Sequence, residues 1–267
     1  MIRRSIRPHT ALALGVLSVL LLLAAYTALA IRQYHRNPDD TTIPRWNQLQ
    51  KGFVSAIEVN KRSGDRWLVA DALASGQRLF LGLGCGILAA FGLGLLMGCS
   101  PCAEAALNPP LSLLAKVPPT AALAVFFVLV GTGNNMYVAM IAFGILPTLA
   151  MTVYLAVKEF PDELLFKAYT LGASNTEVVW NIIVRQVLPR FIDAVRLSIG
   201  PAMVYLIAAE MVVGDVGFGY RIRLQSKLLN MSVVYPYLAL LAGFGFGMDY
   251  LLTRARRRLC PWYQAAS

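Results

Sequence analysis

Long apolar segments that lack charge dominate this sequence and limit the folds open to it. Segments of about 17–25 predominantly apolar residues are long enough to cross the hydrocarbon core of a bilayer as helices. Three segments meet this criterion without a charged residue: Ala11–Ile31, Leu79–Met97 and Met136–Val157. Three more meet it with one or two ionisable residues each: Leu111–Val130, Leu197–Val213 and Val233–Leu252. The sequence therefore predicts an all-α, polytopic membrane helix bundle, with about six transmembrane helices in one domain covering residues 1–267.

The charge of the chain lies mainly near the ends of the predicted spans. Only 14% of the residues are charged, against about a quarter in soluble domains, yet the formal net charge is +10. Arginines flank the first and last predicted spans: Arg3, Arg4, Arg7, Arg254, Arg256, Arg257 and Arg258. Because basic residues close to span ends mark the cytoplasmic side, we predict that both termini are cytoplasmic. We expect membrane lipids around the chain and no nucleic-acid partner.

Prolines interrupt the third, fourth and fifth predicted spans, at Pro118-Pro119, Pro147 and Pro201. Proline removes an amide donor and clashes with the preceding turn, so it breaks or kinks a helix. Broken backbone at membrane depth is tolerated only where protein or a water-filled cavity surrounds it. We therefore expect a central bundle around a pathway. Ordinary proline use in membrane helices is the alternative.

Glu210 is a lone acid inside the fifth predicted span. A carboxylate within a membrane is costly and usually faces a cavity or a charged partner. Glu210 could line the pathway, pair with Arg221 or Arg223, or lie near the outer interface. Four residues are candidates for the pathway or its gate: Pro118, Thr120, Asn134 and Glu210. Thr120 and Asn134 are chosen by position alone.

Residues that would support chemistry are missing from the sequence. It contains no Gly-x4-Gly-Lys-Ser/Thr loop, which binds the phosphates of ATP in P-loop proteins. Its two histidines, His9 and His35, lie outside the predicted spans and far from any group of carboxylates. We expect no catalytic, cofactor or metal site in this chain, which is therefore not an enzyme.

A polar segment of unusual length, residues 158–190, separates the fourth and fifth predicted spans and is interrupted at Gly172 and Pro189. Acidic residues near its start suit a helix N-terminus, and apolar residues follow at helical spacing to form one compact face: Leu164, Leu165, Ala168 and Leu171. Gly172 can adopt a positive φ and end that helix. The alternation of spans predicts that this segment is cytoplasmic. We predict that it contacts a second protein through the following residues: Asp162, Glu163, Leu165, Lys167, Ala168, Leu171, Gly172, Ala173 and Ser174. An amphipathic loop packed on its own protein is the alternative.

Several short motifs, taken with the spans, resemble those of ABC importer permeases of the binding-protein-dependent type I class. They are Leu171-Gly172-Ala173-Ser174, Leu188-Pro189, Ala209-Glu210-Met211, Gly217-Phe218-Gly219-Tyr220 and Arg258-Leu259-Cys260-Pro261-Trp262. More narrowly, the chain resembles the nitrate, taurine and aliphatic-sulfonate permeases over about residues 70–263.

The resemblance implies a set of partners and a location. Permeases of this kind act as dimers in the bacterial inner membrane, so a second copy of this chain is expected. Two ATPase subunits, which bind ATP and Mg, would dock on the cytoplasmic segment, and a periplasmic or lipoprotein binding protein would deliver a small anion or zwitterion. An ion-gradient-driven secondary transporter and a non-transport membrane scaffold are the alternatives.

The cytoplasmic segment departs from the family pattern in two ways. Family members have a Glu-Ala-Ala-x3-Gly loop, where this chain has Phe166-Lys167-Ala168. Fifteen residues separate Gly172 from Leu188, where the family pattern has eleven. Because four residues make about one helical turn, we expect a longer helix after the Gly172 turn.

Overall fold

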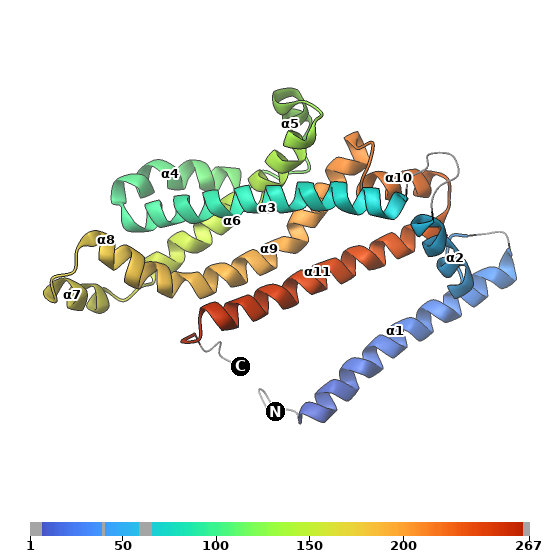
Figure 1. The fold of residues 1–267 in the computed structure, drawn as a ribbon, viewed down its shortest axis with the longest axis horizontal. Coiled ribbons are helices and arrows are strands. Elements are labelled where there is room, and N and C mark those ends of the chain that lie inside the picture. The colour runs from blue at the N-terminus through green and yellow to red at the C-terminus, as the bar shows by residue number, and fades with distance from the viewer. Residues whose placement is uncertain (1–6, 39–40, 59–65, 264–267) are drawn as a thin grey trace. The chain divides into compact units, whose positions relative to one another are not determined.

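The computed structural model describes residues 7–38, 41–58 and 66–263, and most of them are helical (Figure 1). They form two compact units. The N-terminal unit comprises the described residues up to Trp67 together with Ile222–Leu238. The core unit comprises Leu68–Arg221 and the described residues from Ala239 onward. The single domain expected from the sequence stays a prediction.

The N-terminal unit is built on helix α1 (Pro8–Arg36) and helix α2 (Trp46–Ile57). Most apolar side chains of α1 are exposed, as expected of a helix surrounded by lipid. Tyr26 anchors α1, because its hydroxyl donates a hydrogen bond to the Pro44 carbonyl at 2.7 Å. Its ring also meets those of Trp46 and Tyr235 edge-on, with centroids 5.5 and 6.0 Å away.

The remaining helices lie wholly or partly in the core unit. They are α3 (Trp67–Cys99), α4 (Pro101–Leu114), α5 (Leu123–Val130), α6 (Asn134–Lys158), α7 (Asp162–Thr170), α8 (Asn175–Glu177), the π-helix η1 (Val178–Ile183), α9 (Val184–Val213), α10 (Phe218–Lys227) and α11 (Met231–Leu259). Among the described residues, five helical segments are long and apolar enough to cross a membrane: α1, α3, α6, the run from α8 to α9, and α11.

The break expected at Pro118-Pro119 is present in the third predicted span. Helix α4 ends at Leu114 and α5 begins at Leu123, with turns between them. Eight residues of α5 extend only about 12 Å at 1.5 Å per residue. Leu111–Val130 is therefore a broken element rather than one continuous spanning helix. This break explains why the described residues contain five continuous spans, whereas the sequence predicted about six.

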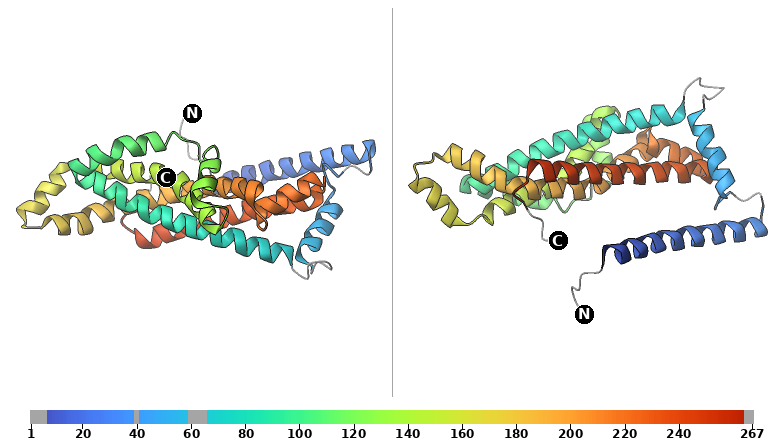
Figure 2. Two further views of the ribbon diagram at one scale, coloured as in Figure 1. Left: turned by 90° about the horizontal axis from the view of Figure 1, so that it is seen from above. Right: turned by 60° about the horizontal axis from the view of Figure 1, so that its bottom comes forward.

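The core of this unit lies along α6, which packs against α3 and α9 (Figures 1 and 2). Glycines let α3 approach α6 closely. A Cβ on Gly82 would lie 2.7 Å from Ile141, and one on Gly94 would lie 2.5 Å from the Ala150 carbonyl oxygen. Such close helix packing is typical of membrane bundles, where small residues line helix interfaces.

Helix α9 begins earlier than the sequence predicted, and the expected interruption at Pro189 is wrong. A continuous helical run of 39 residues extends from Asn175 to Val213 through the π-helix, so the longer helix expected after Gly172 is present. Pro189 lies inside α9 and is buried. Its fixed φ is compatible with a helix, and only one backbone hydrogen bond is lost there. Neighbouring helices make such a loss tolerable.

Candidate functional site

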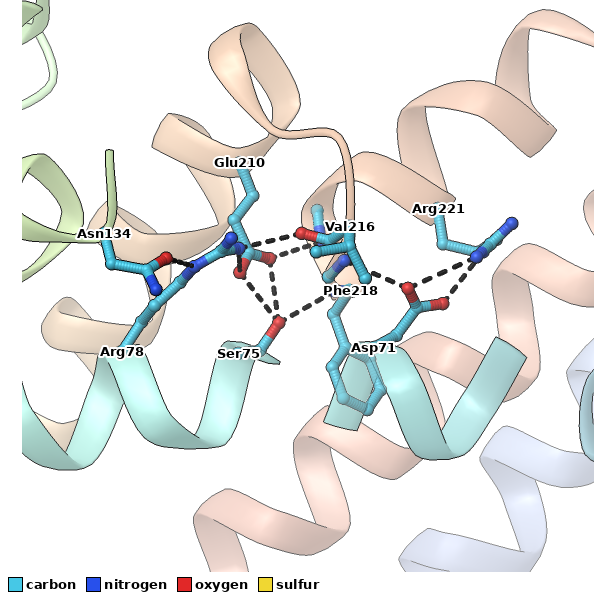
Figure 3. A network of polar contacts seen from close by, with 10 residues as sticks. Asp71, Ser75, Arg78, Asn134, Glu210, Val216, Phe218 and Arg221 are labelled. Carbon is cyan, nitrogen blue, oxygen red and sulfur yellow. Dashed lines mark hydrogen bonds and ion pairs between the residues drawn. The ribbon is translucent and has the colours of Figure 1, made fainter. Parts of the chain in front are cut away.

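Glu210 lies at the centre of a buried polar network in the core unit (Figure 3). It is fully buried, and its carboxylate pairs with Arg78, whose Nη1 lies 2.8 Å away. The Ser75 hydroxyl approaches its two oxygens at 2.8 and 2.9 Å, and the Gly219 backbone N–H donates to it at 2.9 Å. The partner is Arg78 rather than the Arg221 or Arg223 considered from the sequence.

A second ion pair lies in the same network. The fully buried Asp71 accepts from Arg221 Nε at 2.8 Å and from the Gly217 backbone N–H at 3.0 Å. The Ser75 hydroxyl also accepts from the Phe218 N–H at 2.9 Å. These bonds join α3 to the loop after α9 and to the start of α10. Within each ion pair the two formal charges cancel.

Glycines permit the tight fold of this loop around Glu210. Gly217 has a φ of 127°, in a region that L side chains rarely adopt. A Cβ there would lie 2.4 Å from a Glu210 carboxylate oxygen, and one on Gly219 would lie 2.5 Å from the Ile207 carbonyl oxygen. The Gly217-Phe218-Gly219 motif therefore reflects close backbone approach to a buried carboxylate.

The structure brings two of the four pathway candidates together. Arg78 Nε donates to Asn134 Oδ1 at 3.0 Å, so Arg78 connects Asn134 to Glu210 (Figure 3). Pro118 and Thr120 line a different cavity of about 360 Å³, beside Gly144 on α6. The role of all four residues in transport stays a prediction.

Sequence reasoning missed Asp71, Ser75 and Arg78, although they form most of the network. The predicted second span began at Leu79, whereas α3 begins at Trp67. The three residues are spaced at i, i+4 and i+7, which places them on one face of a helix. That spacing of polar residues just before an uncharged span was the available signal.

The predicted contact segment is two helices joined by a sharply defined turn. Gly172 has the positive φ expected, at 85°. Its N–H donates to the Tyr169 carbonyl at 2.9 Å, and the N–H of Ala173 donates to the Ala168 carbonyl at 3.1 Å. This pair of bonds is the Schellman motif that ends helices. Ser174 then opens α8 with a capping box, in which two side chains satisfy backbone N–H groups reciprocally.

The apolar face predicted for this segment is divided in the structure. Ala168 is buried and Leu165 is half-buried against the core. Leu164 is exposed, and Leu171 is 88% exposed. One part of the predicted face is therefore buried against the core, and the other part is exposed. Leu164 and Leu171 are therefore outward-facing apolar side chains, together with Phe166, which is 67% exposed.

The charged contact candidates lie on the surface of the same segment. Asp162 and Glu163 occupy the first turn of α7, and Lys167 lies in its last turn. All three are exposed, as is Ser174, while Ala173 is half-buried.

Ion pairs tie the end of α6, next to this segment, to two neighbouring helices. Lys158 Nζ lies 2.7 Å from a Glu104 oxygen of α4, and Glu104 also accepts from the Tyr154 hydroxyl at 2.5 Å. Hydrogen bonds from Lys158 and Tyr154 lower the pKa of Glu104. Glu159 pairs with Arg190 of α9. The end of α6, which leads into α7, is therefore held by α4 and α9.

A second group of ion pairs joins the first half of α9 to the C-terminal part of α11. Arg196 Nε lies 2.7 Å from Asp249, and Arg256 pairs with Asp193. These pairs place the basic C-terminal end of α11 next to the first half of α9.

Comparisons with known proteins support one family. A solved structure of the methionine ABC transporter MetNI, in an inward-facing conformation, matches 72% of this chain and 96% of its own chain with a TM-score of 0.64. Because the two sequences are 19% identical, this likeness shows the fold alone.

Curated relatives are permease proteins. The taurine transport system permease protein TauC of Escherichia coli is 30% identical over 74% of this chain and 72% of its own. The putative aliphatic sulfonates transport permease protein SsuC of Bacillus subtilis is 25% identical over 68% and 64%. The nitrate import permease protein NrtB of Synechocystis is 24% identical over 64% and 62%.

The family model described as "Binding-protein-dependent transport system inner membrane component" matches residues 82–259. That range covers every described helix from α4 to α11 and the second half of α3. The chain therefore belongs to the family of binding-protein-dependent transport system inner membrane components, the multi-pass permease subunits of ABC importers.

Proposed function

We propose that this permease forms the pathway for a small anion or zwitterion. We further propose that the motion of a partner ATPase reaches the permease through α7 and the turn at Gly172. ABC permeases of this type work with ATPase subunits and a binding protein. The observation that carries the coupling proposal is the exposed apolar surface of α7 and its turn, held in one geometry by the Schellman motif.

An ATPase is the partner that fits this surface. Leu171 and Phe166 are exposed, and burying large apolar side chains in a partner's groove gives favourable binding energy. The end of α6 is tied by ion pairs to α4 and α9. A partner that moves α7 would therefore move several helices together. We infer two ATPase subunits, each on one copy of a homodimer, with ATP and Mg bound by the ATPases and no catalytic residue in this chain.

The proposed orientation places α7 and both termini in the cytoplasm of a bacterium. Arg256 pairs with Asp193 in the first half of α9, so the basic end of α11 lies toward the start of the helical run that follows α7. Basic residues at span ends favour the cytoplasmic side, and Arg254, Arg257 and Arg258 lie at the same end. Arg3 and Arg4, which belong to the same prediction, lie outside the described residues. We place the chain in the inner membrane, surrounded by lipids.

The proposed solute class follows from the relatives. Their names specify taurine, aliphatic sulfonates and nitrate, which share an oxyanion group. We propose that this chain transports a small solute with such a group, delivered by a soluble binding protein to the face of the membrane opposite α7.

The test of this proposal is ATP hydrolysis by a purified complex of this chain with its ATPase, with and without the binding protein. Stimulation by the binding protein is expected in the wild type. Gly172→Val should reduce it roughly five- to thirtyfold, since a β-branched residue opposes the left-handed conformation at a cost of about 1–2 kcal/mol. Gly172→Asn is the matched control, because Asn tolerates that conformation and nothing lies within 4 Å of a Cβ there.

Uptake driven by an ion gradient without ATP would instead support a secondary transporter. The absence of both activities would support a membrane scaffold. Equal stimulation of the wild type and the Gly172→Val complex would refute the role of the turn.

A further inference from the structure

We propose that a cavity beside Arg78 binds the solute directly and that it is built for a zwitterion, with an oxyanion at one end and an ammonium group at the other. This inference rests on the proposed transport function. The cavity has a volume of about 460 Å³ and lies where α3, the start of α6 and the end of α9 meet. The lining residues that carry the inference are Arg78, Thr132, Asn134, Tyr137 and Asp215.

Arg78 supplies donors to this cavity from a buried position. Its side chain is only 6% exposed, and its guanidinium group lies 4.2 Å over the Tyr137 ring. Nε donates to Asn134, and Nη1 donates to Glu210 and to the Val216 carbonyl (Figure 3). Among the described residues, Nη2 has no hydrogen-bond partner. The N–H groups through which Arg78 can meet a bound molecule are therefore those of Nη2, which suit an oxyanion.

The start of α6 adds a second source of positive potential. This helix has 25 residues, and its N-cap, Gly133, makes no side-chain capping bond. Gly133 and Asn134 both line the cavity. A helix N-terminus carries about half a positive charge, and its free N–H groups bind anions. The hydroxyl of Thr132, in the same lining, is a further donor. Arg78 and the uncapped helix together form an oxyanion half-site.

The charge balance favours a zwitterion over a simple anion. Glu210 already neutralises Arg78. Asp215 is exposed in the lining and has no ion-pair partner within the part of the chain that the structure describes. Arg78, Glu210 and Asp215 therefore leave one formal negative charge at the cavity. A simple anion would add to it, whereas a zwitterion adds no net charge and offers its ammonium group to Asp215. Aminosulfonates and amino acids are the classes that fit.

The experiment measures equilibrium binding to the purified permease–ATPase complex without the binding protein, with taurine and ethanesulfonate as probes. These molecules share the sulfonate, and only taurine has an ammonium group. Asp215→Asn should weaken taurine binding about tenfold, since one charge-assisted hydrogen bond is lost. It should leave ethanesulfonate binding unchanged or stronger, because a negative charge is removed from the cavity. Thr132→Val should weaken both about equally, by roughly fivefold. Glu58→Gln is the control and should change neither, because Glu58 is an exposed acid at the C-cap of α2.

Both variants alter exposed residues outside the buried ion pairs, so they keep the fold intact for the measurement. A larger loss for taurine than for ethanesulfonate in Asp215→Asn supports the inference. Equal losses for the two probes in Asp215→Asn, no effect of either variant, or no saturable binding by the wild type would overturn it. ATP hydrolysis stimulated by the binding protein, measured in the same preparation, would show that the proposed transport function stands even then.

Discussion

The buried pair of Arg78 and Glu210 should behave as one energetic unit, so replacing both partners should cost less than the sum of the two single replacements. Glu210 is fully buried, and the Arg78 side chain is 6% exposed. Removing one partner of a buried ion pair costs about 3–5 kcal/mol, because the remaining charge is left without compensation. We therefore expect Glu210→Gln to lower the free energy of unfolding by about that amount.

The double variant tests whether the cost comes from the uncompensated charge. Arg78→Met removes the other partner with little change in side-chain length. Combined with Glu210→Gln, it should restore about 1–3 kcal/mol relative to the sum of the two single changes, the coupling expected of residues in contact. The assay is reversible unfolding of the purified protein in detergent micelles, followed by circular dichroism.

The matched control is Glu163→Gln, the same chemical change at an exposed position of α7. Surface changes of this kind usually alter stability by less than about 0.5 kcal/mol. Equal effects of Glu210→Gln and Glu163→Gln would refute the structural reasoning. So would strict additivity of the two changes at Arg78 and Glu210.

Two further predictions concern other contacts. Gly217→Ala should destabilise the fold by several kcal/mol, since its φ is 127° and its Cβ would lie 2.4 Å from a Glu210 oxygen. Thermal unfolding is the measurement. The control, Gly84→Ala, should show little change, because no atom lies within 4 Å of a Cβ there. The pKa of Glu104 is lowered by Lys158, so the stability that this carboxylate contributes is present above its unfolded-state pKa and is lost as the pH falls through its lower folded-state pKa. In Lys158→Met that loss should be smaller and complete at a higher pH, because the folded-state pKa of Glu104 is less depressed. Unfolding measured from pH 7 to pH 3 should show identical profiles for the two proteins if the ion pair contributes nothing.

The buried network explains why charged residues can persist in this bundle. An isolated charge in a membrane is expensive, and such residues usually pair within the bundle. Here Asp71 and Glu210 each have an arginine partner, and the backbone N–H groups of Gly217 and Gly219 satisfy further acceptor positions. Because these bonds also hold the loop that lines the cavity beside Arg78, the same residues that stabilise the fold position the proposed solute site.

Local sequence patterns were sufficient to predict the helical membrane class, the break at Pro118-Pro119 and the left-handed turn at Gly172. The reason is physical. Hydrophobic length, proline's missing donor and glycine's backbone freedom act within one helical turn or one span. The polar helix α7 and its position before a long helical run could be inferred in the same way.

Tertiary structure alone decided which charges pair and which surfaces remain exposed. Arg78 and Glu210 lie 132 positions apart in the sequence, and Asp71 and Arg221 lie 150 apart, so no local pattern distinguishes these partners from Arg223. Packing also carries the helix through Pro189 and leaves Leu171 outside the core. These features depend on how α3, α6, α9 and α10 come together, because the energy of a buried charge is set by all the groups that surround it.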